Sequence, residues 1–347
     1  MRLLVVFPGR GSYGPAELGS LRRLAGSSAE AARAVEEVIA AMDAPRREAR
    51  RPSIADLDAA AAFDPETHLA GENASALIVA CALADFLLLE RAGASIAGIT
   101  GNSLGFYAAL GASGALSLED TGRLVEEMAS LQATHGAGGQ VIVPVSGDDW
   151  LADSSQARAA DDAVAAGTAW LSVDLGSFRV LGARDADLLA ARLPKTRLGG
   201  REYPMVLAKH RAFHTPLVAD VADAVSTSWN LEWRTPRHHL LLGNGAIATP
   251  WSADPRALAE YTLREQVVTP FRLAAAIRTG LRELAPDAVV LTGPGESIGG
   301  SLGASILAEG WRGLRTRDAF RARQSADPVL LSLARPDQRA RVLTTSP

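Results

Sequence analysis

Short apolar runs alternate along the chain with longer segments rich in alanine and leucine. The short runs predict strands, and the longer segments, where apolar residues recur at helical spacing, predict helices. The predicted strands are 2–7, 96–100, 140–145, 169–174, 177–181, 238–243 and 287–292. The predicted helices are 27–42, 71–92, 104–113, 117–133, 149–166, 184–193, 215–227, 255–266, 270–284 and 299–309. This alternation indicates an α/β fold with a parallel sheet.

Two of the predicted helices have recognisable first residues. Ser117 precedes Glu119 and Asp120, which is the pattern of a capped helix start. Thr269-Pro270 would place a proline in the first turn of the helix over 270–284, where the missing N–H needs no partner.

The stretch over 137–206 has a different texture. It follows the order strand, helix, strand, strand, helix, strand, with glycines at both ends of the stretch. This order predicts a ferredoxin-like unit inserted into a larger body formed by residues 1–136 and 207–347. From residue 311 onward, eight arginines stand against three aspartates. We expect a solvated, partly mobile tail there, and a docking surface for an acidic partner is the alternative.

Composition narrows the classes of protein. With 48% apolar residues, 21% charged residues and a net charge of −4 over 347 residues, the chain is globular and lacks the basic face of a nucleic-acid protein. No apolar run is long enough to cross a membrane. The single cysteine, Cys81, lies in an apolar run and predicts a buried thiol in a reduced compartment. The start at 2–7 reads as a strand rather than a signal peptide, so we expect a cytoplasmic protein. The six histidines lack metal-ligand spacing, and no metal is expected.

Glycines 9, 11 and 14 satisfy a dinucleotide-binding pattern directly after the first strand. However, prolines flank the motif on both sides, and the residues that follow predict a helix rather than a second strand ending in an acid. The motif therefore predicts a tight loop whose backbone N–H groups face a site at the carboxyl ends of the strands.

The pattern G-x-S-x-G occurs at 101–105 and again at 295–299, each time between a predicted strand and a predicted helix. Such a turn exposes its serine as a nucleophile, and that serine needs a general base. The elbow architecture places the base after the nucleophile in chain order. All six histidines precede Ser297, whereas five follow Ser103. We therefore interpret Ser103 as the nucleophile and Ser297 as part of a structural corner.

Four sequence blocks resemble the malonyl-CoA:acyl carrier protein transacylases and the polyketide synthase acyltransferases. They are Phe7-Pro8-Gly9-Arg10-Gly11-Ser12, Gly101-Asn102-Ser103-Leu104-Gly105 with the following Phe106-Tyr107-Ala108-Ala109-Leu110, Ala212-Phe213-His214-Thr215-Pro216-Leu217, and Gly293-Pro294-Gly295 after a strand. The blocks resemble the family motifs F-P-G-Q-G-S, G-H-S-L-G-E-Y-A-A-L, A-F-H-S-x-L/M and G-P-G, and they occur in family order.

The resemblance implies an α/β-hydrolase-like subdomain with a ferredoxin-like insertion and a ping-pong reaction. Ser103 would take an acyl group from acyl-CoA and pass it to the phosphopantetheine thiol of an acyl carrier protein, with His214 as general base. The backbone N–H groups of Leu104 and Arg10 would form the oxyanion hole. In this family a backbone carbonyl orients the histidine, and Asn244, near that region, is the predicted supporting residue. No tightly bound cofactor is implied.

This sequence departs from the family pattern at the substrate-binding positions. Met128 stands where the family has an arginine that holds the malonyl carboxylate, Ala74 replaces a glutamine, Asn102 replaces the histidine before the nucleophile, and Arg10 replaces a glutamine. Either the acyl group has no free carboxylate, or the positive charge has moved.

Arg10 and Arg211 are the candidates for a relocated charge, and we favour Arg10. Phe213 resembles the bulky residue that favours a small or linear acyl chain. His210 is predicted as a polar edge, with a substrate contact as the alternative. Two other functions stay open: an acyl hydrolase that unloads carrier proteins, and a non-catalytic scaffold that binds carrier protein. The acyl group, the carrier and the pathway are not determined by the sequence.

Overall fold

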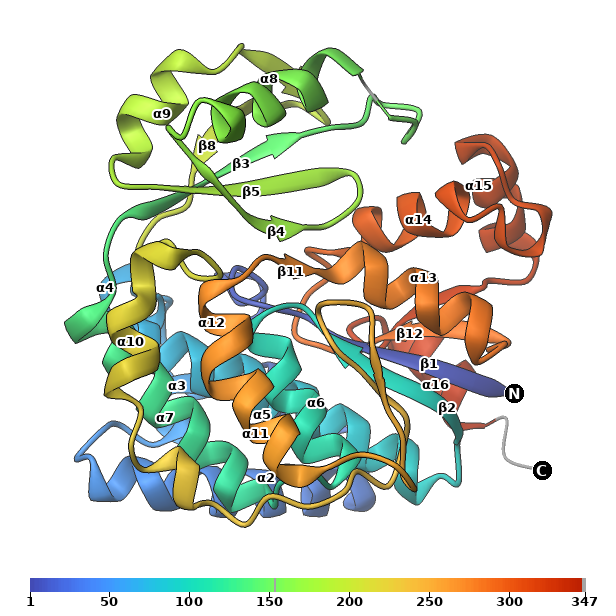
Figure 1. Ribbon diagram of the computed structural model, residues 1–347. Coiled ribbons are helices and arrows are strands. Elements are labelled where there is room, and N and C mark those ends of the chain that lie inside the picture. The colour runs from blue at the N-terminus through green and yellow to red at the C-terminus, as the bar shows by residue number, and fades with distance from the viewer. Residues whose placement is uncertain (153, 345–347) are drawn as a thin grey trace.

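The computed structural model describes residues 1–152 and 154–344. Within them, six strands form the sheet of the body in the order β10-β9-β2-β1-β12-β13 (Figure 1). All neighbours are parallel except β10 and β9. The strands are β1 (Arg2–Phe7), β2 (Ser95–Gly101), β9 (Leu240–Leu241), β10 (Ile247–Ala248), β12 (Ala288–Leu291) and β13 (Leu330–Ser332). The expected parallel α/β class is confirmed.

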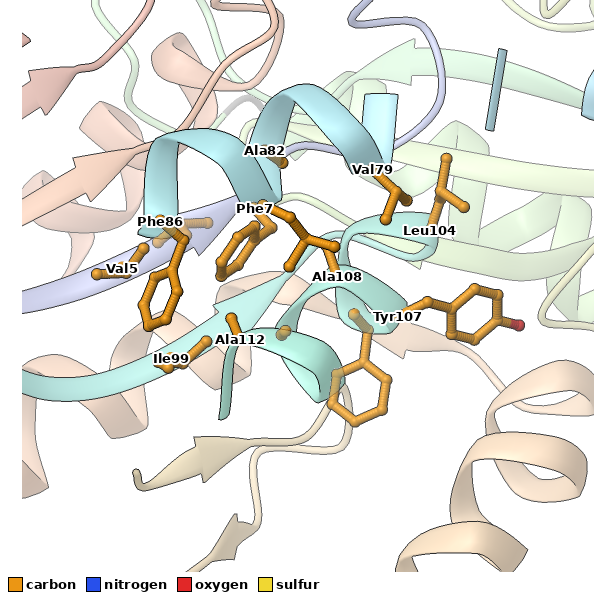
Figure 2. Packing of buried hydrophobic residues seen from close by; sticks show 14 of the residues in the cluster. Val5, Phe7, Val79, Ala82, Phe86, Ile99, Leu104, Tyr107, Ala108 and Ala112 are labelled. Atoms are coloured by element: carbon orange, nitrogen blue, oxygen red, sulfur yellow. The ribbon is translucent and has the colours of Figure 1, made fainter. Parts of the chain in front are cut away.

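Helices cover both faces of this sheet. The long helices of the body are α2 (Ala29–Glu48), α5 (Gly71–Arg91), α6 (Leu104–Ser113), α7 (Leu118–His135), α13 (Leu273–Glu283) and α14 (Gly299–Ala308). On one face, Val79 and Phe86 of α5 pack with Phe7 of β1 and Ala108 of α6 (Figure 2). On the other face, α13 lies so close to β1 that a Cβ atom at Gly280 would stand 2.8 Å from Leu4 Cδ2. Burial on both faces explains the continuous apolar run of β1.

The inserted unit, drawn green to yellow in Figure 1, is built on a second sheet. Its strands β3 (Gly139–Pro144), β4 (Trp170–Asp174), β5 (Phe178–Ala183) and β8 (Met205–Val206) pair antiparallel in the order β4-β5-β3-β8. Helices α8 (Ser154–Ala165) and α9 (Ala186–Arg192) complete the predicted ferredoxin-like order. Val141, Leu181 and Leu189 are buried in a separate small core. The domain boundaries at 137 and 207 stay a prediction.

A strand from the body extends this second sheet. β11 (Phe271–Arg272) pairs in parallel with β4, with Phe271 opposite Val173 and Arg272 opposite Asp174. This pairing corrects the prediction that Thr269-Pro270 opens a helix, because α13 begins only at Leu273. The proline instead ends the preceding helical segment, since the residue before a proline is disfavoured in the α conformation. The backbone of the body is thereby hydrogen-bonded to the inserted unit.

Several short elements show no periodicity that would predict them, because they span too few residues. They are α1 (Ser20–Ala25), α3 (Ile54–Asp58), α4 (Pro65–His68) and the strand pair β6 (Thr196–Leu198) and β7 (Arg201–Tyr203). The predicted helix over 215–227 is divided into η1 (Pro216–Val218) and α10 (Ala219–Ala224), followed by η2 (Ser228–Asn230). The predicted helix over 255–266 consists of α11 (Pro255–Glu260), a π-helical turn η3 (Tyr261–Glu265) and α12 (Gln266–Val268).

Two local features agree with the sequence patterns, and a third departs from the expectation that no apolar run is long enough to cross a membrane. Ser117 caps α7 by accepting a hydrogen bond from the backbone N–H of Asp120. Cys81 is a free, buried thiol, and burial raises its pKa well above the ordinary value. α5 is long and apolar enough to cross a membrane by length and composition, but 83% of its most apolar window is buried, as in a core helix.

Between residues 311 and 344 the chain is not the mobile tail that its charge predicted. η4 (Trp311–Gly313), α15 (Arg317–Ala326), β13 and α16 (Pro336–Leu343) pack on the body, and β13 pairs in parallel with β12. Leu331 is 0% exposed. Asp327 pairs with both Arg323 and Arg341 at 2.5 Å, so part of the arginine excess is neutralised locally. The apolar residues between the charges decided the outcome, because burying them against the sheet stabilises the ordered state.

We predict that Leu331→Ala lowers the free energy of unfolding by about 2–4 kcal/mol, because it leaves a cavity beside β12. Urea denaturation measures the change, and Arg335→Ala, at an exposed side chain of the same segment, is the control and should change stability by less than about 0.5 kcal/mol. Equal stabilities of Leu331→Ala and wild type would show that β13 is not part of the folded core.

Candidate active site

Ser103 stands at the turn between β2 and α6 in a backbone conformation that few residues adopt. Its φ is +53° and its ψ is −108°, which is a strained position for a residue with a side chain. Flanking glycines permit the turn. A Cβ atom at Gly101 would lie 2.1 Å from the carbonyl oxygen of Gly105, and one at Gly105 would lie 2.4 Å from that of Phe7. The predicted strand-turn-helix elbow is therefore present, with Ser103 as the N-cap residue of α6.

The side chain of Ser103 is hydrogen-bonded to His214. The distance from Ser103 Oγ to His214 Nε2 is 2.6 Å, across 111 positions of sequence. His214 follows the inserted unit, is 2% exposed and has a φ of +59°. The predicted hydrogen bond between these two residues is confirmed, and no other histidine bonds to Ser103 within the described ranges.

Two backbone carbonyls hold the histidine in place. Gln266 O lies 2.5 Å from His214 Nδ1, and Val267 O accepts a hydrogen bond of 2.8 Å from the His214 backbone N–H. Both carbonyls belong to the last turn of a helical segment that Pro270 ends, where carbonyls lack partners within the helix. Since a carbonyl only accepts, Nδ1 carries the proton, and the lone pair of Nε2 faces the serine.

Asn244 does not support the histidine, contrary to the sequence prediction. It is exposed, its Oδ1 accepts from the Ala246 backbone N–H at 3.0 Å, and its Nδ2 lies 3.2 Å from Glu265 Oε1. A supporting backbone carbonyl was implied by the resemblance, but its position at Gln266 was not. The proline at 270 was the available signal, because a helix that ends there leaves the carbonyls of its last turn free.

Burial lowers the pKa of His214 to about 4, although its hydrogen bond to Gln266 acts in the opposite direction. The imidazole is therefore neutral at pH 7 and able to accept the serine proton. The negative end of the helical segment that ends at Val268 faces the ring and favours the imidazolium that forms during proton transfer.

Ser103 opens into a cavity of ≈ 260 Å³ between the body and the inserted unit. Most of its wall is apolar, and Met128 is 3% exposed at this wall. The body contributes the elbow, the first loop and one face of α7, and the inserted unit contributes its sheet. The lining includes Arg10, Gly11, Asn102, Leu104, Tyr107, Val125, Met128, Gln132, Gln140, Ile142, Val173, Leu175, Phe178, Val180, Arg201, Tyr203, His210, Phe213 and Ser297.

Two backbone N–H groups at this cavity are free to donate. Neither Leu104 N–H nor Arg10 N–H has a protein acceptor within the described ranges. Leu104 is the first residue of α6, where N–H groups lack intrahelical partners and carry partial positive charge. A Cβ atom at Gly9 would come within 2.5 Å of the Asn102 carbonyl oxygen, so the first loop packs directly on the elbow. This packing brings both donors to the same cavity as Ser103.

No protein-family model matches the chain. One curated relative, polyketide synthase GfsB from Streptomyces halstedii, is 28% identical over 216 residues, which are 61% of this chain and 4% of that protein. The chain therefore corresponds to a small part of the length of that relative.

Solved structures match nearly the whole chain. An acyl-carrier-protein S-malonyltransferase from Burkholderia pseudomallei 1710b aligns with a TM-score of 0.73 at 19% identity, over 99% of both chains. A malonyl-CoA:acyl carrier protein transacylase from Coxiella burnetii aligns at 0.73 and 16%, over 99% of this chain and 97% of that one. The acyltransferase domain of the second module of the salinomycin polyketide synthase aligns at 0.71 and 23%, over 99% and 71%. The chain has the acyltransferase fold.

Within this acyltransferase fold, the predicted substrate-contacting residues lie at different places. Met128 and Phe213 line the cavity beside Ser103. Arg211 is exposed and lines an adjoining cavity of ≈ 590 Å³ instead. His210 lines both cavities, and its Nδ1 lies 3.0 Å from Gln140 Oε1. Burial and the nearby charge of Arg10 lower the pKa of His210 to about 3, so this half-buried side chain is neutral at pH 7, and its role as a polar edge or a substrate contact stays a prediction.

Ser297 lies on the loop before α14 and lines the same cavity as Ser103. In the described part of the chain it is hydrogen-bonded to no histidine. Residues 1–152 and 154–344 contain no group of three or more His, Cys, Asp or Glu side chains that could bind a metal ion.

Covalent labelling with a serine-reactive fluorophosphonate tests the assignment of Ser103 as the nucleophile. Wild type and Ser297→Ala should be labelled at similar rates, and Ser103→Ala should not be labelled. His214→Ala should slow labelling about a hundredfold or more, because the proton of Ser103 loses its acceptor. Labelling of Ser103→Ala at the wild-type rate would contradict the assignment.

The pH dependence of that labelling reports on His214. Only the neutral imidazole accepts a proton, and a pKa of about 4 keeps it neutral well below the ordinary value near 6.5. We therefore expect a rate at pH 5.0 within about twofold of the rate at pH 7.5, with the fall beginning nearer pH 4. Circular dichroism at each pH controls for acid unfolding. A fall centred near pH 6.5 would show that the histidine is solvated.

Proposed function

We propose that this protein transfers an acyl group from acyl-CoA to the phosphopantetheine thiol of an acyl carrier protein, through an ester on Ser103. The observation that carries the proposal is the hydrogen bond of 2.6 Å between Ser103 Oγ and the neutral Nε2 of His214 at a cavity of ≈ 260 Å³. The acyltransferase fold agrees with this reaction, and so does the predicted pair of oxyanion donors.

In the first half-reaction, His214 Nε2 takes the proton of Ser103 as Oγ forms a bond to the thioester carbonyl carbon. The negative charge on the carbonyl oxygen is stabilised by the N–H groups of Leu104 and Arg10, which have no other acceptor in the described part of the chain. When the carbon–sulfur bond breaks, the imidazolium returns its proton to the leaving thiolate of coenzyme A. The product is an acyl ester on Ser103.

The second half-reaction runs through the same groups in reverse. His214 takes the proton of the phosphopantetheine thiol, the thiolate attacks the ester carbon, and Ser103 leaves with the proton from the imidazolium. The carbonyls of Gln266 and Val267 keep the ring in one orientation through both proton transfers. No tightly bound cofactor takes part in this scheme, and a cytoplasmic location remains the prediction from sequence.

Two observations weigh on the alternative functions. A scaffold that only binds carrier protein has no use for a serine held in a strained conformation against a buried base. An acyl hydrolase would use the same dyad with water in the second half-reaction. The apolar part of the cavity wall, which includes Val125, Met128 and Phe213, favours transfer, because it offers a water molecule no hydrogen-bond partner beside the acyl chain.

Intact-protein mass spectrometry after incubation with a panel of acyl-CoAs tests the proposal. We expect one acyl adduct on wild type and on Ser297→Ala, none on Ser103→Ala, and loss of the adduct when a holo acyl carrier protein is added, with the carrier gaining the same mass. Release of free acid as fast without carrier would identify a hydrolase. Absence of any adduct across the panel in wild type would contradict a covalent mechanism.

A further inference from the structure

Arg10 carries a positive charge at the acyl cavity. Its side chain is partly buried and lines both the cavity of Ser103 and the adjoining cavity of ≈ 590 Å³. Nη1 donates to Gln132 Oε1 at 3.1 Å, and Nη2 donates to the Lys209 carbonyl at 3.1 Å. A guanidinium has five N–H donors, so these two bonds leave three for a ligand.

Both partners of this guanidinium are neutral. Among the described residues, no carboxylate lies within 4.0 Å of it. The acids nearby are engaged elsewhere, since Glu72 pairs with Arg51 at 3.0 Å and Glu66 with the Lys209 ammonium at 2.9 Å. Burial lowers the pKa of Arg10 to about 10, which leaves the side chain protonated at pH 7. Glu72 attracts Arg10 only from beyond ion-pairing distance, so a carboxylate that binds beside the guanidinium would add a contact that the described residues do not supply.

The partner residues place this charge at the wall of the cavity into which Ser103 opens. Gln132 lies one helical turn after Met128 on α7, and residues four apart share a helix face. The guanidinium therefore reaches the same wall of the cavity that Met128 lines. The backbone N–H of Arg10 is one of the two predicted oxyanion donors, so one residue would present its N–H to the acyl carbonyl and its guanidinium to the cavity wall.

We propose that Arg10 binds the free carboxylate of a dicarboxylic acyl group such as malonyl, and that Gln132 holds the guanidinium in position for it. This inference rests on the proposed acyl transfer and names its substrate class. A planar guanidinium matches a carboxylate through two parallel hydrogen bonds. Arg201 lines the same cavity but is exposed to solvent, whereas Arg10 is partly buried in the loop that packs on the elbow, so Arg10 is the cation that has lost more of its hydration.

A phosphate of the coenzyme or of phosphopantetheine is the other anion that Arg10 could meet, because Arg10 also lines the adjoining cavity. Four acyl donors separate the two sources: malonyl-CoA, acetyl-CoA, and the malonyl and acetyl thioesters of N-acetylcysteamine, which carry no phosphate. The measured quantity is the ratio of malonyl to acetyl loading rates on Ser103 in single-turnover mass spectrometry, for the CoA pair and for the phosphate-free pair.

We expect wild type to load malonyl faster than acetyl in both pairs. In Arg10→Gln both ratios should fall about tenfold to a hundredfold, the range for one lost hydrogen bond to a charged group. Arg278→Gln, at an exposed side chain on α13, is the matched control and should keep the wild-type ratios. Gln132→Glu should also lower both ratios, because its carboxylate would occupy the guanidinium in place of the substrate.

Three results would contradict the proposal. If Arg10→Gln slows both CoA thioesters alike and changes neither phosphate-free thioester, Arg10 binds a phosphate. If wild type loads acetyl as fast as malonyl in both pairs, the cavity takes neutral acyl groups. If Gln132→Glu folds, as judged by circular dichroism, and keeps the wild-type ratios, the guanidinium is not at the acyl group. Absence of loading by any donor would instead overturn the proposed transferase itself.

Discussion

The hydrogen bond between Ser103 and His214 connects two parts of the chain that the inserted unit separates. It forms only when the elbow after β2 keeps its strained geometry and when β8 returns the chain to the body at the correct place. The position of His214 also depends on the carbonyl of Gln266, which lies in the helical segment that ends before Pro270. This segment leads directly into β11, the strand that pairs with β4 of the inserted unit. The two sheets are therefore fixed relative to each other by the same contacts that orient the base.

Burial determines the electrostatic character of the site. His214 and His210 are both neutral because desolvation disfavours their charged forms, whereas Arg10 stays protonated at the same cavity. Partial charges at two helix ends complement this pattern: the first N–H groups of α6 face a developing oxyanion, and the last carbonyls before Pro270 face a developing imidazolium. These dipoles are already oriented in the folded protein, so the charge separation of each proton transfer requires little reorganisation.

The acyltransferase fold is retained over 99% of the chain at 16–23% identity to the structures compared above. In this chain the elbow and the histidine are held by backbone contacts, whereas the wall formed by α7 and the first loop is made by side chains. Met128 contributes an apolar surface, and Arg10 brings a charge from the neighbouring loop to Gln132. Side chains of the cavity wall can therefore differ without moving Ser103 or His214, because backbone contacts hold these two residues in place.

Local sequence determined β1, β2, α5 and α6 closely, because their apolar periodicity and glycine turns act over neighbouring residues. It also favoured Ser103 over Ser297 as the nucleophile, since the elbow and the order of histidines are visible in the chain, whereas only the family resemblance pointed to His214 among the five histidines that follow. Tertiary structure alone decided that Gln266 rather than Asn244 holds the histidine and that Pro270 ends one helix instead of opening another. It likewise decided that the arginine-rich end adds β13 to the sheet. Each of these depends on contacts between distant segments, where burial and free backbone groups outweigh local composition.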